Sequence, residues 1–181
     1  MKLRAARDVN EGEEITTSYC TLLCPASERQ QALAPYEIAC GCPACLNATV
    51  SDKRRNSFLN RKSISPPFNP TSPSGGGPET DDEWVQPVVR MIQEMEEEGI
   101  QAQDEYRLTL HQALNAYTMM GHEEKAVYYG KKLYASYLAL GQGKAYKRYT
   151  EVESLKTSPQ WGLMRLARGV NGVPPVLFSF A

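Results

Sequence analysis

The spacing of apolar residues in the second half of the chain predicts a series of helices. Between residues 81 and 169, apolar side chains recur every three or four positions, which is the period of an amphipathic helix. The helices expected from this period cover residues 81–98, 101–121, 123–140 and 145–155, with a last turn or two in 161–168. Glycine closes the first three runs, at Gly99, Gly121 and Gly141. The tail 170–181 lacks the period and is expected to be irregular.

The two helices around Gly121 are similar to one tetratricopeptide-type unit. The intervals typical of that helix–turn–helix repeat are met by Leu110, Ala113, Tyr117, Gly121 and Ala126. One such unit cannot bury its own apolar face, so residues 81–169 would stack as an α-helical, tetratricopeptide-like array. A generic antiparallel helix pair would give much of the same pattern, and both interpretations stay open.

The first sixty residues predict a mixture of strand, turn and helix. Residues 10–13 (Asn-Glu-Gly-Glu) are typical of a hairpin turn, and residues 14–19 are rich in β-branched and aromatic residues, as strands are. We expect a small β-hairpin there, and a helix after Pro25 that Ser27 caps and Pro35 ends. Another short helix is expected at 51–59. The fold class is therefore α+β and predominantly α.

Composition indicates where the linker lies and in which cellular compartment the protein is expected. Residues 47–80 are first basic and then rich in proline, glycine and serine, as a flexible linker is. The net charge is −1, and no run of eighteen apolar residues or signal-type amino terminus occurs, so neither a membrane nor direct nucleic-acid binding is expected. Five cysteines in one region indicate a reducing, intracellular location, the nucleus or the cytoplasm. The run Lys53-Arg54-Arg55 fits a nuclear-import signal or a solvated face.

Three cysteines lie within six positions, in the sequence Cys40-Gly-Cys42-Pro-Ala-Cys45. A loop with this spacing can turn three thiolates toward one point, and Zn²⁺ prefers tetrahedral sulfur ligands. A redox dithiol or ordinary packing are the alternatives. A fourth ligand is not obvious nearby, because both histidines lie far downstream at His111 and His122. Either of two upstream cysteines would complete a four-thiolate site: Cys20 or Cys24.

Residues 6–19 (Ala-Arg-Asp-Val-Asn-Glu-Gly-Glu-Glu-Ile-Thr-Thr-Ser-Tyr) resemble the closing segment of a SET domain, the catalytic fold of protein lysine methyltransferases. The cysteine motif that follows is similar to the post-SET zinc loop, so residues 1–46 would be the end of a SET domain with that loop. A helical, tetratricopeptide-like domain after the loop is the arrangement of the SET–MYND subgroup and its fungal relatives. The resemblance implies zinc ligands at Cys40, Cys42 and Cys45.

The same resemblance implies roles for three further residues. Tyr19 would be the active-site tyrosine, Tyr36 a wall of the lysine channel, and Ile38 a contact of the cofactor's adenine. The implied function is methyl transfer from S-adenosylmethionine to a lysine of a protein substrate, a histone or another protein. A protein partner on the helical domain is also implied.

SET domains bind the cofactor through a Gly-x-Gly and an Asn-His-Ser-Cys segment, and neither occurs ahead of residues 6–19. We therefore expect the carboxyl-terminal portion of such an enzyme, truncated and inactive alone, without appreciable binding of S-adenosylmethionine. The alternative is a non-catalytic module that binds proteins through its zinc loop and helices.

Overall fold

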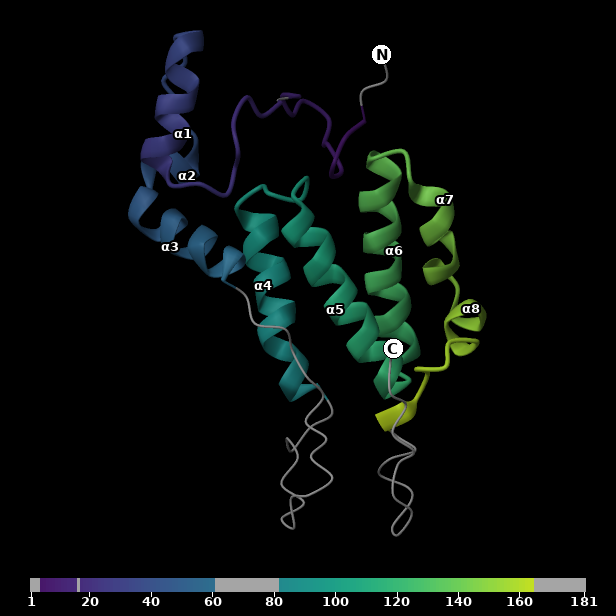
Figure 1. The fold of residues 1–181 in the computed structure, drawn as a ribbon. Coiled ribbons are helices and arrows are strands. Elements are labelled where there is room, and N and C mark those ends of the chain that lie inside the picture. Colours follow the sequence, from purple (N-terminus) through teal and green to yellow (C-terminus); the bar gives the residue numbers. More distant parts are fainter. Residues whose placement is uncertain (1–3, 16, 61–81, 165–181) are drawn as a thin grey trace, which may run out of the picture.

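The computed structural model describes residues 4–15, 17–60 and 82–164, and these residues are predominantly helical (Figure 1). The α-helices are α1 (Ala26–Leu33), α2 (Pro43–Leu46), α3 (Ala48–Leu59), α4 (Gln86–Glu97), α5 (Asp104–Met120), α6 (Glu123–Ala139), α7 (Gly143–Tyr146) and α8 (Val152–Lys156). Three short 3₁₀ segments join them: η1 (Ala34–Tyr36), η2 (Glu83–Val85) and η3 (Lys147–Thr150). None of the described helices is long and apolar enough to cross a membrane.

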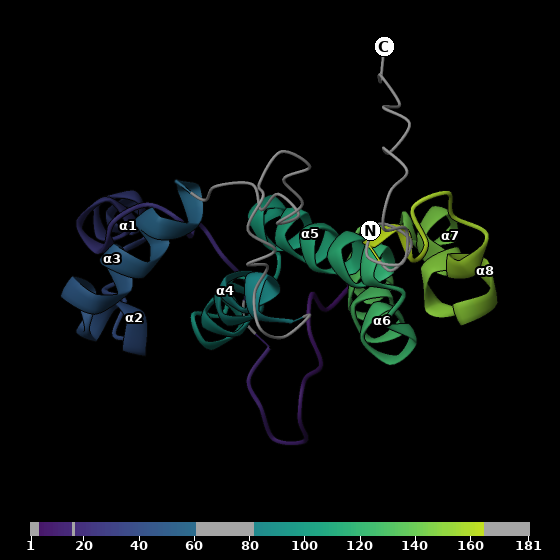
Figure 2. The same cartoon turned by 90° about the horizontal axis from the view of Figure 1, so that it is seen from below.

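The helices follow one another in a row. Figures 1 and 2 both place α1–α3 at one end, α4, α5 and α6 side by side in the middle, and α7 and α8 at the other end. The contacts agree, since α3 meets α4, α4 meets α5, α5 meets α6, and α6 meets α7, η3 and α8. The expected α-helical array is therefore present, while its tetratricopeptide character stays a prediction.

The core lies between α4, α5 and α6. Gly121 has a left-handed φ of 65° and ends α5, and the backbone N–H of His122 donates to the carbonyl of Tyr117 at 2.9 Å. This close turn folds α6 back onto α5, so that the rings of Tyr117 and Tyr129 stack with centroids 5.4 Å apart. The side chains least exposed to solvent come mostly from these helices: Ile92, Met95, Leu110, Leu114, Tyr117 and Leu133.

The prediction of a single helix over residues 145–155 is wrong. The chain forms α7 and η3, becomes extended at Glu151 with φ −124° and ψ 127°, and starts again as α8. Contacts with α6 hold the segment just before the break. The carbonyl of Tyr149 lies against Gly130 of α6, and the ring of Tyr146 stacks on Tyr137 at 3.6 Å.

The β-hairpin remnant expected near residues 10–19 is not found among the residues that the structure describes. The turn itself is correct: Gly12 has φ 81°, and the N–H of Glu13 donates to the carbonyl of Asn10 at 3.1 Å. The flanking residues form no strand; Thr16 lies outside the described residues. Ile15 is 86% exposed. A two-stranded hairpin with no further strand to cover it is marginal, which explains why the segment stays open.

The predicted helices at 25–33 and 51–59 are confirmed, with different ends. Ser27 caps nothing; α1 starts after Pro25, and the N–H of Ala26 donates to Asp52 of α3 at 2.8 Å. Helix α3 starts at Ala48, three residues earlier than expected. The proline- and glycine-rich part of the linker and the tail 170–181 lie outside the described residues, as does the end of the turn expected at 161–168.

A buried arginine joins this amino-terminal end to the array. Arg55 of α3 forms an ion pair with Glu98, which follows α4, at 3.2 Å, and both side chains are nearly inaccessible to solvent. Its guanidinium also donates to the carbonyl of Leu22 and to the hydroxyl of Ser51. One side chain thus fixes the loop before α1, helix α3 and the end of α4 against one another.

Candidate metal centre

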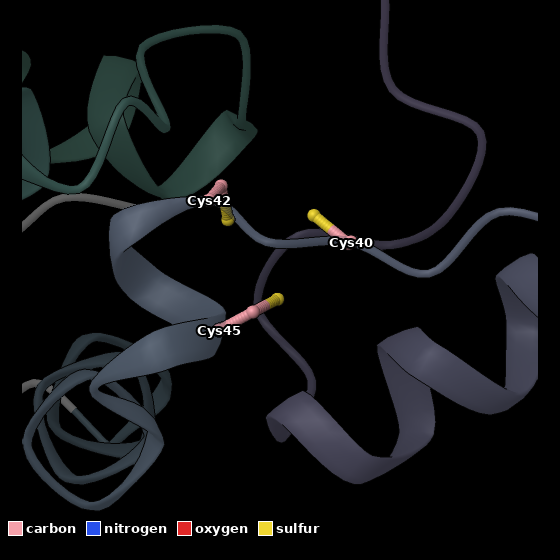
Figure 3. A group of neighbouring side chains, drawn as sticks. All are labelled: Cys40, Cys42 and Cys45. Atoms are coloured by element: carbon pink, nitrogen blue, oxygen red, sulfur yellow. The ribbon is translucent and has the colours of Figure 1, made fainter.

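The three cysteines of the loop converge. The Sγ atoms of Cys40, Cys42 and Cys45 all lie within 4.8 Å of one another. Figure 3 shows the three side chains pointing toward a common point, Cys40 from the loop and the other two from the start and the third residue of α2. Adjacent sulfurs around a tetrahedral Zn²⁺, each at about 2.3 Å from the metal, are about 3.8 Å apart. A small inward movement of the thiols would therefore create three positions of a zinc site.

The local sequence explains how two of the sulfurs meet. Pro43 occupies the first position of α2, where its missing N–H costs nothing and its fixed φ favours a helix. Cys42 precedes it at the N-cap, and its carbonyl accepts hydrogen bonds from the N–H groups of Cys45 and Leu46, both at 2.9 Å. Residues three apart in a helical turn face the same side. The spacing Cys-Pro-x-Cys is thus converted into two sulfurs on one side of α2.

The third sulfur is positioned from α1. The side-chain amide of Gln30 donates to the carbonyl of Cys40 at 2.7 Å and accepts from the N–H of Cys40 at 3.1 Å. Such a paired amide contact satisfies both backbone groups of the residue and fixes its orientation. The loop residue of the cluster is therefore held by two hydrogen bonds from one side chain of α1.

A buried cation lies beside the thiols. Arg29 of α1 is 3% exposed, and its Nη2 donates to the Sγ of Cys45 at 3.7 Å. Its Nη1 lies 3.5 Å from the carboxylate of Asp52 and also donates to the carbonyl of Cys24. Sequence reasoning missed the roles of Arg29, Gln30 and Asp52, because each depends on the packing of α1 against the loop or α3.

The surroundings shift the pKa values of two of the thiols in opposite directions. Burial raises the pKa of the Cys42 thiol, but hydrogen bonds from the N–H groups of Cys45 and Ala44 and from the other thiols outweigh it, and the pKa is lowered. Burial raises the pKa of Cys45, and proximity to the other two thiols adds to the effect against the opposing hydrogen bond from Arg29. Such sharing of protons is typical of a cluster of like titratable groups.

The candidates for a fourth ligand lie outside the cluster. Neither Cys20 nor Cys24 is among the grouped sulfurs, and the thiol of Cys24 donates to the carbonyl of Thr21 at 2.9 Å. His111 of α5 is surrounded by the rings of three tyrosines on α6, α7 and η3, and His122 precedes α6 beside Tyr117. Among the described residues, the cluster thus has three sulfur donors.

The two tyrosines singled out in the sequence come together. The rings of Tyr19 and Tyr36 are 5.4 Å apart at an angle of 47°, although 16 residues separate them. Both are exposed, at 56% and 58%, and Ile38 is 39% exposed. Glu37, between Tyr36 and Ile38, has a left-handed φ of 56°. The chain therefore turns after η1, and the N–H of Ile38 donates to the carbonyl of Leu33 at 3.4 Å. The result is a small aromatic surface on the segment that leads into the thiol cluster.

Comparison of the chain with protein-family models, with curated proteins and with solved structures finds no match in any of the three. What the chain does is therefore inferred from its own residues and their geometry.

Proposed function

We propose that Cys40, Cys42 and Cys45 hold a structural Zn²⁺, and that the chain carries part of the site of a SET-type protein lysine methyltransferase. The convergence of the three sulfurs supports this most directly, because three thiols within 4.8 Å of one another fit a soft metal better than any need of packing. The contact between Tyr19 and Tyr36 adds to it, because the resemblance assigns both residues to one site.

Zinc binding would convert the three thiols to thiolates and release three protons. Zn²⁺ contributes no redox chemistry and is held here by α2 and by the loop that Gln30 clamps. Its role in this chain would be to fix residues 36–46 in one conformation. That segment holds Tyr36 and Ile38, so the metal would keep both side chains in position for substrate and cofactor.

The proposed reaction requires little covalent chemistry from the protein. S-adenosylmethionine, when bound, supplies a methyl group that is already activated as a sulfonium. The chain's own residues would align the lysine amine: the ring of Tyr36 accepts the lysine stem, and the hydroxyl of Tyr19 orients the neutral nitrogen. A phenol oxygen at this position also stabilises the charge that moves with the methyl group. The substrate would be a histone or another protein.

The non-catalytic alternative is favoured by a separate observation. The buried core is formed almost entirely by α4–α6 and the segments packed on them, and the amino-terminal end contributes mainly Leu23 and Phe58. A helical array with its own core is suited to presenting a surface to a protein partner. On this interpretation the zinc loop only stabilises one end of the array.

The test uses the longest natural translation product that contains this sequence. Its zinc content is measured by mass spectrometry, and transfer of a labelled methyl group to histones and to the other proteins of a cell extract is measured with the wild type and Tyr19→Phe. Tyr128→Phe is the matched control, because it removes an equally exposed phenol on α6, at 52% exposure. We expect about one zinc per chain, and methyl transfer that only Tyr19→Phe abolishes.

Two outcomes would contradict the proposal separately. A product that holds zinc but transfers no methyl group would contradict the proposed methyltransferase activity and support the non-catalytic interaction module. A product without zinc would overturn the metal site itself.

A further inference from the structure

Arg29 places a buried positive charge against the thiol cluster, and we propose that this residue stabilises the metal-bound, thiolate form of the cluster. The inference rests on the proposed zinc site and assigns a role to a residue outside the ligand set. Arg29 would not bind the metal. It would act through Cys45, as a positioning residue that sets how tightly the metal is held.

The contacts of Arg29 point to the sulfur. Only 3% of the residue is exposed, so its charge is separated from solvent and needs compensation within the protein. Nη2 donates to the Sγ of Cys45 at 3.7 Å, whereas Nη1 is engaged by Asp52 and by the carbonyl of Cys24. The two ends of the guanidinium thus face different partners, and one of these partners is a candidate metal ligand.

The strength of the hydrogen bond from Arg29 depends on whether the sulfur of Cys45 is a neutral thiol or a thiolate. A neutral thiol is a weak acceptor, so the guanidinium gains little from it when the metal is absent. A thiolate accepts a charge-assisted hydrogen bond, which is about twice as strong as a neutral one. Zn²⁺ with three thiolates carries a net negative charge, and a buried guanidinium beside it offsets that charge. Arg29 therefore favours the metal-bound state over the free one.

Asp52 keeps Arg29 in place for this task. Its Oδ1 accepts the N–H of Ala26 at 2.8 Å and lies 3.5 Å from Nη1 of Arg29. One carboxylate thus fixes both the start of α1 and the guanidinium one turn later. Partners of this kind, one step removed from the metal, typically change metal affinity by about 10- to 100-fold when they are removed.

The chain contains a matched control. Arg55 is also 3% exposed and also forms a buried ion pair, with Glu98. Within the described part of the chain, its guanidinium contacts the oxygens of Leu22, Ser51 and Glu98 and no sulfur. If Arg29 served only to join helices, replacing either arginine would disturb the metal site through loss of stability alone. If Arg29 acts on the sulfur, only its replacement changes the metal site beyond that loss.

The experiment compares the full chain with Arg29→Gln, Arg29→Lys and Arg55→Gln. Zinc affinity is measured by competition with a chelator, and Co²⁺ is used as a spectroscopic probe of the sulfur-to-metal charge-transfer band. We expect Arg29→Gln to weaken zinc binding about 10- to 100-fold and to move the band to lower energy, because the thiolate loses a hydrogen bond. Arg29→Lys restores part of the affinity, and Arg55→Gln changes it less than about threefold with the band unmoved.

Equal losses of affinity in Arg29→Gln and Arg55→Gln, or wild-type affinity in Arg29→Gln, would overturn the inference and leave the zinc site intact. Absence of zinc binding by the wild type would instead overturn the proposed function. Should Arg29→Gln not fold, Arg29→Lys against Arg55→Lys carries the same comparison, since both keep the charge and lose the planar fork.

Discussion

Gly130 offers the sharpest test of how the end of the array is built. The residue lies in the middle of α6, where alanine is ordinarily the better helix former by about 1 kcal/mol. A Cβ at this position would lie 1.8 Å from the carbonyl oxygen and 2.8 Å from the carbonyl carbon of Tyr149. Because real Cβ contacts essentially never fall below 3.0 Å, the backbone of η3 would have to move by more than 1 Å.

The gain in helix propensity and the cost of the clash with Tyr149 can be compared. Overpacking of a well-packed contact costs about 1–3 kcal/mol, and a clash with backbone belongs at the upper end of that range. After subtraction of the helix gain, we expect Gly130→Ala to lower the free energy of unfolding by about 2 kcal/mol. For a chain of this size that corresponds to a fall in melting temperature of about 4–8 °C.

The assay is thermal and urea unfolding of the full chain, followed by circular dichroism. Lys131→Ala is the control, since it changes an exposed neighbour in the same helix and should stay within about 0.5 kcal/mol of the wild type. The near-ultraviolet signal should also change in Gly130→Ala alone, because movement of η3 disturbs the stacked rings of Tyr137 and Tyr146. A Gly130→Ala protein as stable as the wild type, or more stable, would refute the close approach of η3 to α6.

Three further outcomes are expected. Of the variants Cys20→Ser and Cys24→Ser, we expect zinc to be lost from the one whose sulfur supplies the fourth thiolate; unchanged zinc in both, measured by mass spectrometry, would exclude a fourth thiolate from either. Glu98→Gln should cost about 3–5 kcal/mol in urea unfolding by leaving the buried Arg55 unpaired. Glu97→Gln, whose side chain is 62% exposed, should cost at most about 1 kcal/mol, and equal costs would contradict the burial of the pair. Burial lowers the pKa of His111, so the folded state favours the neutral ring; its contribution is complete above the ordinary histidine pKa of about 6.5 and is lost as pH falls through that value toward the lower folded pKa. The fall in melting temperature from pH 7.5 to pH 5.5 should therefore be smaller in His111→Gln than in the wild type, and an identical fall in both would count against this.

The sequence predicted the parts of the fold that depend on local pattern. The helices now seen as α4, α5 and α6 follow from the spacing of their apolar residues, and Gly121 ends α5 as a left-handed cap should. The spacing of Cys40, Cys42 and Cys45 predicted that their sulfurs converge, although Gln30 of α1 also positions the first of them. These features are decided within about twenty residues of chain.

The features that the sequence missed depend on contacts between distant segments. The break between η3 and α8 follows a segment in which Tyr149 packs against Gly130 of α6, and nothing near residue 151 signals it. Ser27 was a reasonable cap, but Asp52 on another helix satisfies the start of α1 instead. The strand expected at 14–19 would need a neighbouring strand, and none is present among the described residues. Where a contact with a distant segment determines the backbone conformation, local sequence propensity does not predict it.

The position of Arg55 links metal binding at the thiols to the stability of helices that lie far from them. Because its guanidinium joins the loop at Leu22 to the residue that closes α4, the end of the molecule that carries the thiols cannot separate from the array without breaking a buried ion pair. Any ligand that binds only the folded form raises the stability of everything coupled to that form. Zinc should therefore protect helices that contribute no ligand to it, and slow the exchange of their amide hydrogens with water.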